Sequence, residues 1–217
     1  MKKKFFALVF ASLIAISSSS ALESFIDINL SLPIWLMNDS ESNISTEVRS
    51  TSVAVGFVPR VMFNDVVGLY VGIDLAFPLR EDASITNGFV TNKTTVHRRD
   101  LDSWIGFYAL IAPAIVPVNK EKFKLLIAPG FHYFVHWGKL TVTGIQAKLQ
   151  QFCLGIGANV QAEFHFTERV YLPLGLLFAW DFFGSSHTKA GNTVITMDSG
   201  FAKWFIVQPR IGIGFHF

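Results

Sequence analysis

The strongest pattern in this sequence is a strict alternation of apolar with small or polar residues over several long segments. In residues 26–36, 67–79, 152–166 and 170–182, every position on one of the two alternating faces is apolar. The other face carries residues such as Gly, Asn, Gln, Asp and Tyr. Successive side chains of a β-strand point to opposite faces. This period of two therefore predicts four strands, each with one apolar face.

Four further segments extend the prediction to eight strands. Residues 123–137 and 205–217 alternate in the same way, each interrupted by one proline, and residues 51–63 form a weaker strand. The phase of the eighth segment, residues 101–116, stays open. Its even positions carry both small and large residues, namely Gly106, Leu110, Ala112, Ala114 and Val116.

The links between these segments alternate between short and long. The short links are residues 64–65, 118–121 and 167–169. The long links are rich in Gly, Ser, Thr and Asn and consist of residues 37–49, 80–100, 138–150 and 184–200. Short turns on one side and long loops on the other are typical of bacterial outer-membrane barrels. The sequence therefore predicts an all-β fold. We expect a closed eight-stranded antiparallel up-and-down transmembrane barrel with short periplasmic turns and four longer extracellular loops.

The composition agrees with a membrane location. Hydrophobic residues make up 51% of the chain and charged residues only 16%, against about 25% charged in a typical soluble domain. Backbone polar groups inside a bilayer must be paired within the protein, so a chain without spanning helices crosses as a closed barrel. A soluble secreted barrel of the lipocalin kind is the alternative. The second face of these strands carries too few charges for a water-exposed exterior, which favours the membrane barrel.

The N-terminus predicts export. Three lysines at positions 2–4 precede an apolar stretch, and small residues follow up to Ala21. This is the pattern of a secretory signal peptide. We therefore expect residues 1–21 to be cleaved and residues 22–217 to form a barrel in the bacterial outer membrane. Its first partner would be the lipid bilayer, contacted by outward residues such as Ile28, Leu69, Ile156 and Leu174.

Aromatic residues gather near both ends of the predicted strands. Aromatic belts mark the two interfaces of membrane barrels. The expected girdle on the outer side consists of Trp35, Trp104, Trp137, Trp180 and Trp204. The expected belt on the periplasmic side consists of Phe25, Phe63, Phe123, Phe166 and Phe217.

The chain ends on the strand "RIGIGFHF". The spacing of Pro209, Gly212, Gly214 and Phe217 resembles the end of OmpW-type proteins. The signal, the eight strands and this ending together resemble the small outer-membrane barrels of the OmpW, OmpX and OmpA kind. The Phe-rich, low-charge strands are also similar to small outer-membrane proteins of spirochaetes such as treponemes. The resemblance implies that the last strand closes the barrel against the first. It also implies that Phe215 and Phe217 belong to a signal read by the barrel-assembly machinery.

The resemblance further implies a porin-like role in transport, as a narrow passage or pocket for small, hydrophobic molecules. Eight strands enclose a lumen that side chains nearly fill, which excludes a wide porin. The residues expected to line such a pocket, in the outer half, are Tyr70, Leu126, Phe134 and Leu177. Simple core packing of these four side chains is the alternative.

Charged residues on the inward faces lie toward the periplasmic ends of their strands. An unpaired charge in so narrow a space is costly, so we expect a polar plug of paired charges. Lys124 would pair with Glu163, and Arg210 with Asp27 or Asn29. Solvation at the barrel mouth is the alternative. The full set of plug residues is Asp27, Arg60, Lys124, Glu163, Arg210 and His216.

A second function stays open, in which the four long loops bind host or envelope partners at the cell surface. The basic run "VHRRD" at residues 96–100 shares its loop with acidic residues, so a solvated loop is its simpler interpretation. A net charge of +2 gives no indication of nucleic-acid binding.

Catalysis and metal binding are not expected. His187 lies near two serines but has no supporting carboxylate nearby in the sequence. His132 and His136 share a strand face but lie about 13 Å apart along it, too far to share one metal ion. The single Cys153 cannot form an internal disulfide. The sequence therefore predicts neither an enzyme nor a cofactor.

Overall fold

The computed structural model describes residues 23–41, 44–87, 90–97, 102–142, 145–190, 193–199 and 204–217. The predicted signal peptide, residues 1–21, lies outside the described residues. The strands in these ranges are β1 (Glu23–Ser31), β2 (Ile34–Glu41), β3 (Ile44–Met62), β4 (Val67–Asn87), β5 (Val90–His97), β6 (Ser103–Lys120), β7 (Phe123–Val142), β8 (Ile145–His165), β9 (Val170–Ala190), β10 (Thr193–Ser199) and β11 (Trp204–His216). The described part of the chain contains no helix long and apolar enough to cross a membrane.

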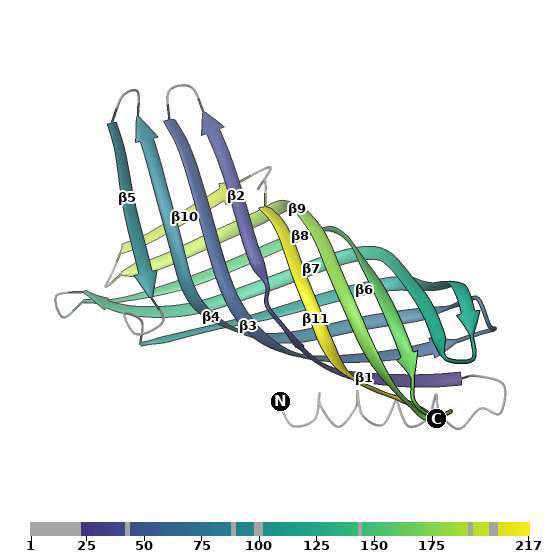
Figure 1. Ribbon diagram of the computed structural model, residues 1–217. Helices are drawn as coiled ribbons and strands as arrows, with labels where there is room; N and C mark the ends of the chain where they lie inside the picture. The colour runs from purple at the N-terminus through teal and green to yellow at the C-terminus, as the bar shows by residue number, and fades with distance from the viewer. Residues whose placement is uncertain are drawn as a thin grey trace.

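Eight strands close into an antiparallel ring. The order around it is β1, β3, β4, β6, β7, β8, β9 and β11, and β11 returns to β1. The predicted closed up-and-down barrel is confirmed (Figure 1). The pairing of Phe25 with His216 through Ser31 with Arg210 also confirms that the last strand closes the barrel against the first.

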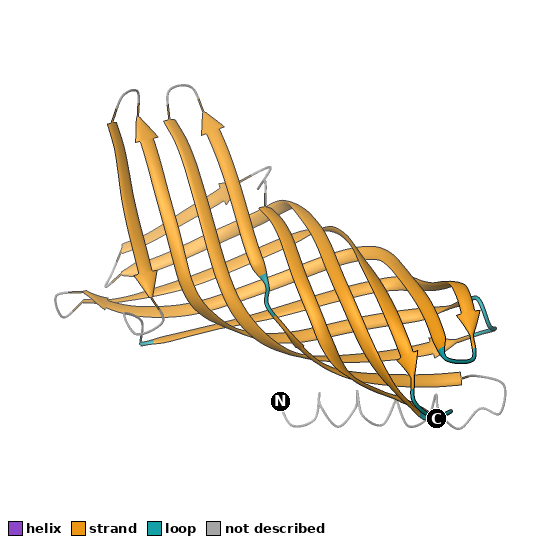
Figure 2. Ribbon diagram, in the orientation of Figure 1, coloured by secondary structure: helices purple, strands orange, loops and turns teal. Residues whose placement is uncertain are grey.

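Strands β1 and β2 form one path along the barrel wall, broken by Leu32 and Pro33 (Figure 2). The hydrogen-bond ladder continues through the break, because Leu32 N–H donates to the Pro209 carbonyl and Ser52 N–H donates to the Pro33 carbonyl. Pro33 has no N–H to contribute. On the facing strand the β3–β4 register shifts between Thr51 and Ser52. A bulge of this kind bends a strand, and the β2–β3 and β4–β5 hairpins rise away from the barrel beyond it (Figure 1).

The four predicted long loops are largely β-hairpins within the described ranges, which corrects the expectation. Strand pairs β2–β3, β4–β5, β7–β8 and β9–β10 continue the ladder almost to each tip. Their sequences are polar and rich in Thr, and they lack the unbroken apolar face that marks the ring strands. Without an apolar face the period-two signal disappears, although the backbone stays extended.

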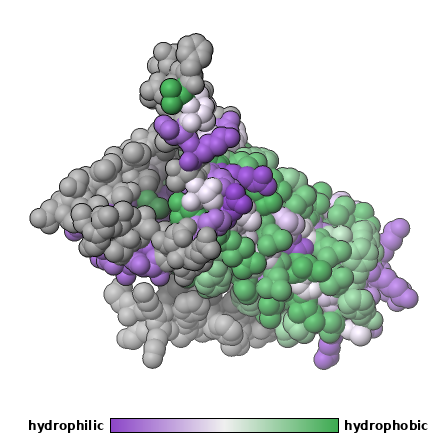
Figure 3. Space-filling view, turned by 60° about the vertical axis from the view of Figure 1, so that its left-hand side comes forward, coloured by the Kyte–Doolittle hydropathy of each residue, from purple (hydrophilic) through white to green (hydrophobic). Residues whose placement is uncertain are grey.

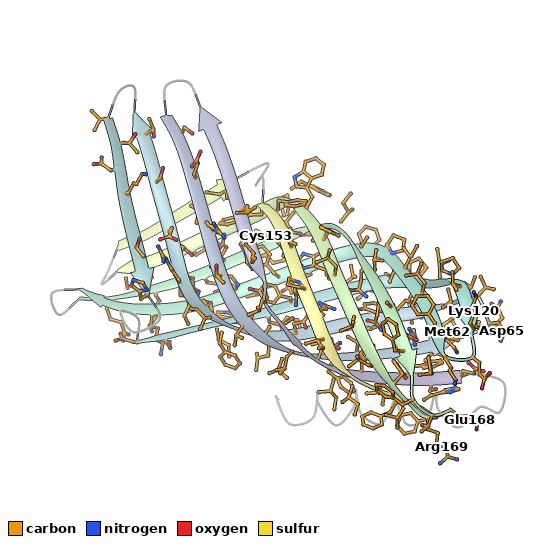
Figure 4. All side chains as sticks on the ribbon, in the orientation of Figure 1. Met62, Asp65, Lys120, Cys153, Glu168 and Arg169 are labelled. Atoms are coloured by element: carbon orange, nitrogen blue, oxygen red, sulfur yellow. The ribbon has the colours of Figure 1, made fainter. Side chains whose placement is uncertain are left out.

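The short turns lie together at the opposite end of the barrel, where Asp65, Lys120, Glu168 and Arg169 are found (Figure 4). Asn64 Oδ1 accepts hydrogen bonds from the N–H groups of Val66 and Val67, an Asx-type turn. Strand β6 extends through Lys120, so the turn expected over residues 118–121 consists only of residues 121–122. This end is the periplasmic end in a barrel of this type.

Inward and outward residues alternate along every ring strand. Ile28, Leu69, Ile156 and Leu174 expose 39–50% of their surface, which confirms that they face outward. An apolar belt covers the visible barrel wall, with hydrophilic residues toward its ends (Figure 3). In β6 all even positions from Trp104 to Val116 are buried. The open phase of this strand is therefore resolved, with its even positions facing inward.

Glycines in the last strand make room for larger side chains in the lumen. A Cβ atom on Gly214 would lie 2.2 Å from the Tyr171 ring, and one on Gly212 would lie 2.2 Å from Asn29 Oδ1. The small residues of "RIGIGFHF" therefore face polar and aromatic side chains that fill the barrel.

Candidate functional site

Polar residues in the lumen nearest the periplasmic end form a hydrogen-bonded group that we name the lower cluster. Arg60 Nη1 lies 2.5 Å from Glu163 Oε1, and both side chains are buried. Gln161 Nε2 donates to Glu163 Oε1 at 3.0 Å and to Asp27 Oδ2 at 2.8 Å. The Tyr171 hydroxyl donates to Asp27 Oδ1. The cluster thus joins Asp27, Arg60, Gln161, Glu163 and Tyr171 from four different strands.

The predicted pairing of Lys124 with Glu163 is wrong. The two residues are partners in the β7–β8 register, but Glu163 forms its ion pair with Arg60. Strands β3 and β8 lie on opposite sides of the ring, so this pair spans the lumen. Lys124 is half-buried and places Nζ 5.3 Å from the ring centroid of Phe25, near the mouth. The long, planar guanidinium of Arg60 reaches the carboxylate and also lies 4.3 Å from the Phe25 centroid.

A middle cluster of Tyr70, Asp74 and Arg210 lies further from the periplasmic end. Arg210 Nη2 forms an ion pair with Asp74 Oδ2, and Arg210 Nη1 donates to the Tyr70 hydroxyl at 3.0 Å. The expected pairing of Arg210 with Asp27 or Asn29 is therefore wrong. The oxygens of Asp27 accept instead from Tyr171 and Gln161. The last plug candidate, His216, stacks on Phe25 with ring centroids 4.3 Å apart.

Aromatic rings fill the outer part of the lumen and form an upper cluster. Trp35 packs on Phe134, Tyr108, His136 and Trp204, with ring centroids 3.9, 5.0, 4.9 and 6.0 Å away. The Tyr108 hydroxyl and His136 Nε2 share a hydrogen bond of 2.6 Å.

Most of the predicted tryptophan girdle is therefore inside the barrel. Trp35 and Trp104 are buried, and Trp204 is half-buried against the upper cluster. Trp137 and Trp180 expose 44% and 51% of their surface, so these two face outward. The phase of the strand that carries Trp104 is open in the sequence, but the alternation itself places Trp35 and Trp204 inward. Phe25 of the opposite belt is buried for the same reason, whereas Phe63, Phe166 and Phe217 are exposed.

The four candidate pocket residues are packed core side chains. Tyr70, Leu126, Phe134 and Leu177 are at most 1% exposed and belong to the same buried cluster. A side chain lining a cavity large enough for water would have accessible surface there. The structure therefore favours the packing alternative for these residues.

Sequence reasoning missed several lumen residues, namely Tyr108, Gln161, Tyr171, Asp74 and Asp181. All five are buried polar or aromatic residues with hydrogen bonds inside the barrel. The alternation already places Asp74 and Gln161 on inward faces, so the signal was present. Their partners lie across the lumen, and a one-strand pattern cannot show this.

The two interior histidines have separate partners. His132 Nδ1 lies 2.9 Å from Asp181 Oδ1, and His136 bonds Tyr108. Within the described ranges, no group of three or more His, Cys, Asp and Glu residues is placed to hold a metal ion.

The outer hairpins β2–β3 and β4–β5 form one four-stranded sheet, which we name the outer sheet. Within it Asp82 Oδ1 accepts from Arg80 Nη2 at 2.8 Å and from the Thr95 hydroxyl at 2.7 Å. Both hydrogen bonds hold the pKa of Asp82 below its usual value, and the one from Arg80 has the larger effect.

A closed ring of eight antiparallel strands, apolar outside and polar within, defines an integral outer-membrane β-barrel. The chain has the fold of the small barrels of the bacterial outer membrane. Among solved structures it is similar to the outer membrane protein OprG from Pseudomonas aeruginosa, with a TM-score of 0.55 and 15% identity over 89% of this chain and 95% of OprG. A major outer membrane protein from Thermus thermophilus gives a TM-score of 0.51 and 11% identity over 88% of this chain and 99% of that protein.

At these identities the likeness shows the fold alone. The resemblance to small outer-membrane barrels is thus confirmed as a fold, whereas its spirochaetal part has no support. No protein-family profile and no curated protein matches the sequence.

Proposed function

We propose that this chain is a non-catalytic surface protein that presents its outer sheet to a host or envelope partner, on a barrel whose lumen is closed. The observation that carries this proposal is the outer sheet itself. Its two hairpins, β2–β3 and β4–β5, rise side by side, away from the barrel (Figure 1).

The outer sheet is ordered well beyond the ring. Strand β4 pairs with β6 only as far as Ala76, and from Arg80 to Asn87 it pairs with β3 and β5. This stretch of eight residues extends about 26 Å. A hydrogen-bonded sheet has a backbone that is already ordered, which favours specific recognition over a loop that must be ordered on binding.

The exposed residues of the outer sheet carry both charge signs, including Glu47, Arg49, Arg80 and Lys93. Mixed charges suit a polar partner such as a protein or glycan surface better than a polyanion. Among the described strands β5 pairs only with β4, so its other edge adds backbone groups to this surface.

The second candidate is a narrow passage, and the polar lumen favours it. Buried polar atoms of Asn29, Asp74 and Asn159 have no hydrogen-bond partner within the described residues. Water is the usual partner of such atoms. This observation supports water or a small polar solute as the permeant, in place of the hydrophobic solute expected from the sequence. Passage would require the Arg60–Glu163 pair to separate.

The test is to shorten the β4–β5 hairpin. Asp82 and Thr95 are register partners, so residues 83–94 can be replaced by Asn-Gly, which closes a two-residue hairpin. The matched control replaces residues 141–146 by Asn-Gly between the partners Leu140 and Ala147 of β7 and β8.

Bacteria displaying each form at equal surface density are then assayed for adhesion to epithelial cells and extracellular matrix. The proposal expects adhesion to be lost with the shortened β4–β5 hairpin and kept with the control. If bacteria lacking the protein adhere as well as those with the native protein, the interaction role is wrong.

A further inference from the structure

Three lysines form a single row across the outward side of strands β7, β8 and β9. Lys139 is the register partner of Lys148, and Lys148 is the partner of Lys189. All three side chains are exposed. Each lies on the outward face of its strand, in phase with Trp137 on β7, Gln150 on β8 and His187 on β9.

Within the described ranges, no acidic residue of β7, β8 or β9 lies on the outward face beside this row. Like charges directly opposite each other on a sheet are destabilising, yet none of the ion pairs within the described ranges includes these lysines. No Asp or Glu occurs between Lys124 and Glu163, a stretch that covers most of β7 and β8. On β9, Asp181 is fully buried and bonds His132 in the lumen. An external anion would relieve the repulsion.

The row lies at the level of lipid headgroups. On β7 the outward residues from Phe123 to Val135 are all apolar or aromatic. Twelve residues of strand extend about 40 Å, or about 28 Å along the membrane normal at a tilt of about 45°. This matches the apolar band of about 25 Å in outer-membrane barrels. Lys139, four residues further on, therefore lies about 9 Å above the edge of the band.

An apolar groove lies below the lysines on the same wall. It has a volume of about 510 Å³. It is lined by the register partners Pro129 and Ala158 and by aromatic residues such as Phe131 and Phe178. Lys139 is eight residues beyond Phe131, which is about 19 Å along the normal at the same tilt. Half of a bilayer with its headgroups is about 20–22 Å, so one lipid molecule can reach both features.

We propose that the β7–β9 wall binds an outer-leaflet lipid with a phosphorylated headgroup, its phosphates on Lys139, Lys148 and Lys189 and an acyl chain in the groove. Ammonium groups bind phosphate as compact point charges with several donors. Three of them in one row suit a headgroup with more than one negative charge. This inference is independent of the adhesion role, because it concerns the opposite wall of the barrel and the membrane itself.

The test compares binding of bisphosphorylated lipid A with the same lipid lacking its phosphates. The refolded full-length barrel is purified in a neutral detergent with each lipid, and the bound lipid is counted by native mass spectrometry. We expect about tenfold more retained bisphosphorylated lipid than dephosphorylated lipid, because each lysine near an anionic headgroup adds attraction. Equal retention of the two lipids would overturn the proposal.

The variant K139Q/K148Q/K189Q should reduce retention of the bisphosphorylated lipid at least about tenfold. The matched control K120Q/K122Q/R169Q removes the same charge from exposed positions at the periplasmic end and should keep the lipid. Folding of both variants is checked by heat-modifiable electrophoretic mobility. If both variants lose the same amount of bisphosphorylated lipid, the lipid is held only by the net charge of the protein, and the proposed site is contradicted. Full displacement by millimolar inorganic phosphate would show an anion site without lipid recognition, and would also contradict it.

Discussion

Buried charges in this barrel are paired across the lumen rather than along neighbouring strands. Arg60 reaches Glu163 on the opposite side of the ring, and Arg210 reaches Asp74. Each arginine connects two parts of the wall that share no backbone hydrogen bond. Side-chain pairs therefore add to the ladder in fixing the shape of the barrel.

Removing one partner of the Arg60–Glu163 pair should strongly destabilise the fold. Arg60→Ala leaves the Glu163 carboxylate buried without its counter-charge, which costs about 3–5 kcal/mol in comparable cases. The measurement is the free energy of unfolding from a urea titration of the barrel refolded in lipid vesicles.

The matched control is Arg80→Ala, which breaks the exposed Arg80–Asp82 pair and should cost about 0–1 kcal/mol. Lys124→Ala should also have a small effect, because Lys124 does not hold Glu163. A loss for Lys124→Ala as large as that for Arg60→Ala would contradict the observed pairing.

A charge placed on the apolar belt tests which face meets lipid. Leu174→Arg puts a guanidinium on the outward face of β9 and should cost about 2–4 kcal/mol if it lies near the bilayer midplane. The same titration measures it, with Asn92→Arg on the exposed strand β5 as control. A near-zero change for Leu174→Arg would reverse the assignment of inside and outside.

At the scale of elements, the β4–β5 hairpin should loosen in acid. The pKa of Asp82 is held low by Arg80 and Thr95, so these contacts stabilise the hairpin above the usual carboxylate range of about pH 4. They are lost as the pH falls through the lowered pKa. Hydrogen exchange of the hairpin amides, corrected for the intrinsic pH dependence, should accelerate at low pH relative to the ring strands.

Asp82→Asn is the control for this prediction. The variant lacks the titrating group, so its hairpin should exchange faster at neutral pH and lose most of the additional acceleration in acid. An unchanged pH dependence in the variant would show that Asp82 is not the group responsible.

The last strand should matter more for assembly in cells than for stability. The Phe217 side chain is 70% exposed, and its N–H donates to the Ser24 carbonyl, so deletion removes little packing. If Phe215 and Phe217 are read by the assembly machinery, deleting Phe217 should lower the outer-membrane level of the protein. Unfolding of refolded protein should change little. Equal assembly of the truncated chain in cells would contradict this role.

The strands that could be predicted are those with one apolar face. Alternation located the ring strands and showed that Ile28 and Leu174 face outward, because lipid on one side and a packed lumen on the other impose a period of two. The polar segments beyond the ring have no such contrast between two faces, so the sequence predicts loops where β5 and β10 lie. The phase of β6 stayed open because the lumen accepts both Ala112 and Leu110.

The lumen contacts could be predicted only in part. Whether a residue faces the lumen follows from its place in the alternation along the strand, and this places Asp27, Arg60 and Glu163 inside the barrel. The partner of each depends on how far a side chain extends across a closed ring, which the sequence does not encode locally. Trp35 is a different case, because its position along the strand suggests an interface whereas its place in the alternation puts it in the lumen.

At the scale of the whole molecule, the barrel divides into three zones. The periplasmic end holds the short turns and the lower cluster, the middle is an apolar belt around a packed lumen, and the outer end carries the hairpins. The outer sheet and the lysine row lie on different strands, so the protein can display one surface to the exterior and another to the membrane.

The most direct test of the closed lumen is the ion conductance of the native protein reconstituted in planar bilayers. The packed side chains and the Arg60–Glu163 pair predict no steady conductance above that of the bare membrane. Brief opening events should be more frequent when this pair is removed in the double variant Arg60→Ala/Glu163→Ala, although the upper cluster still fills the outer lumen. A steady conductance in the native protein, unchanged in the double variant, would contradict a lumen closed by the lower cluster.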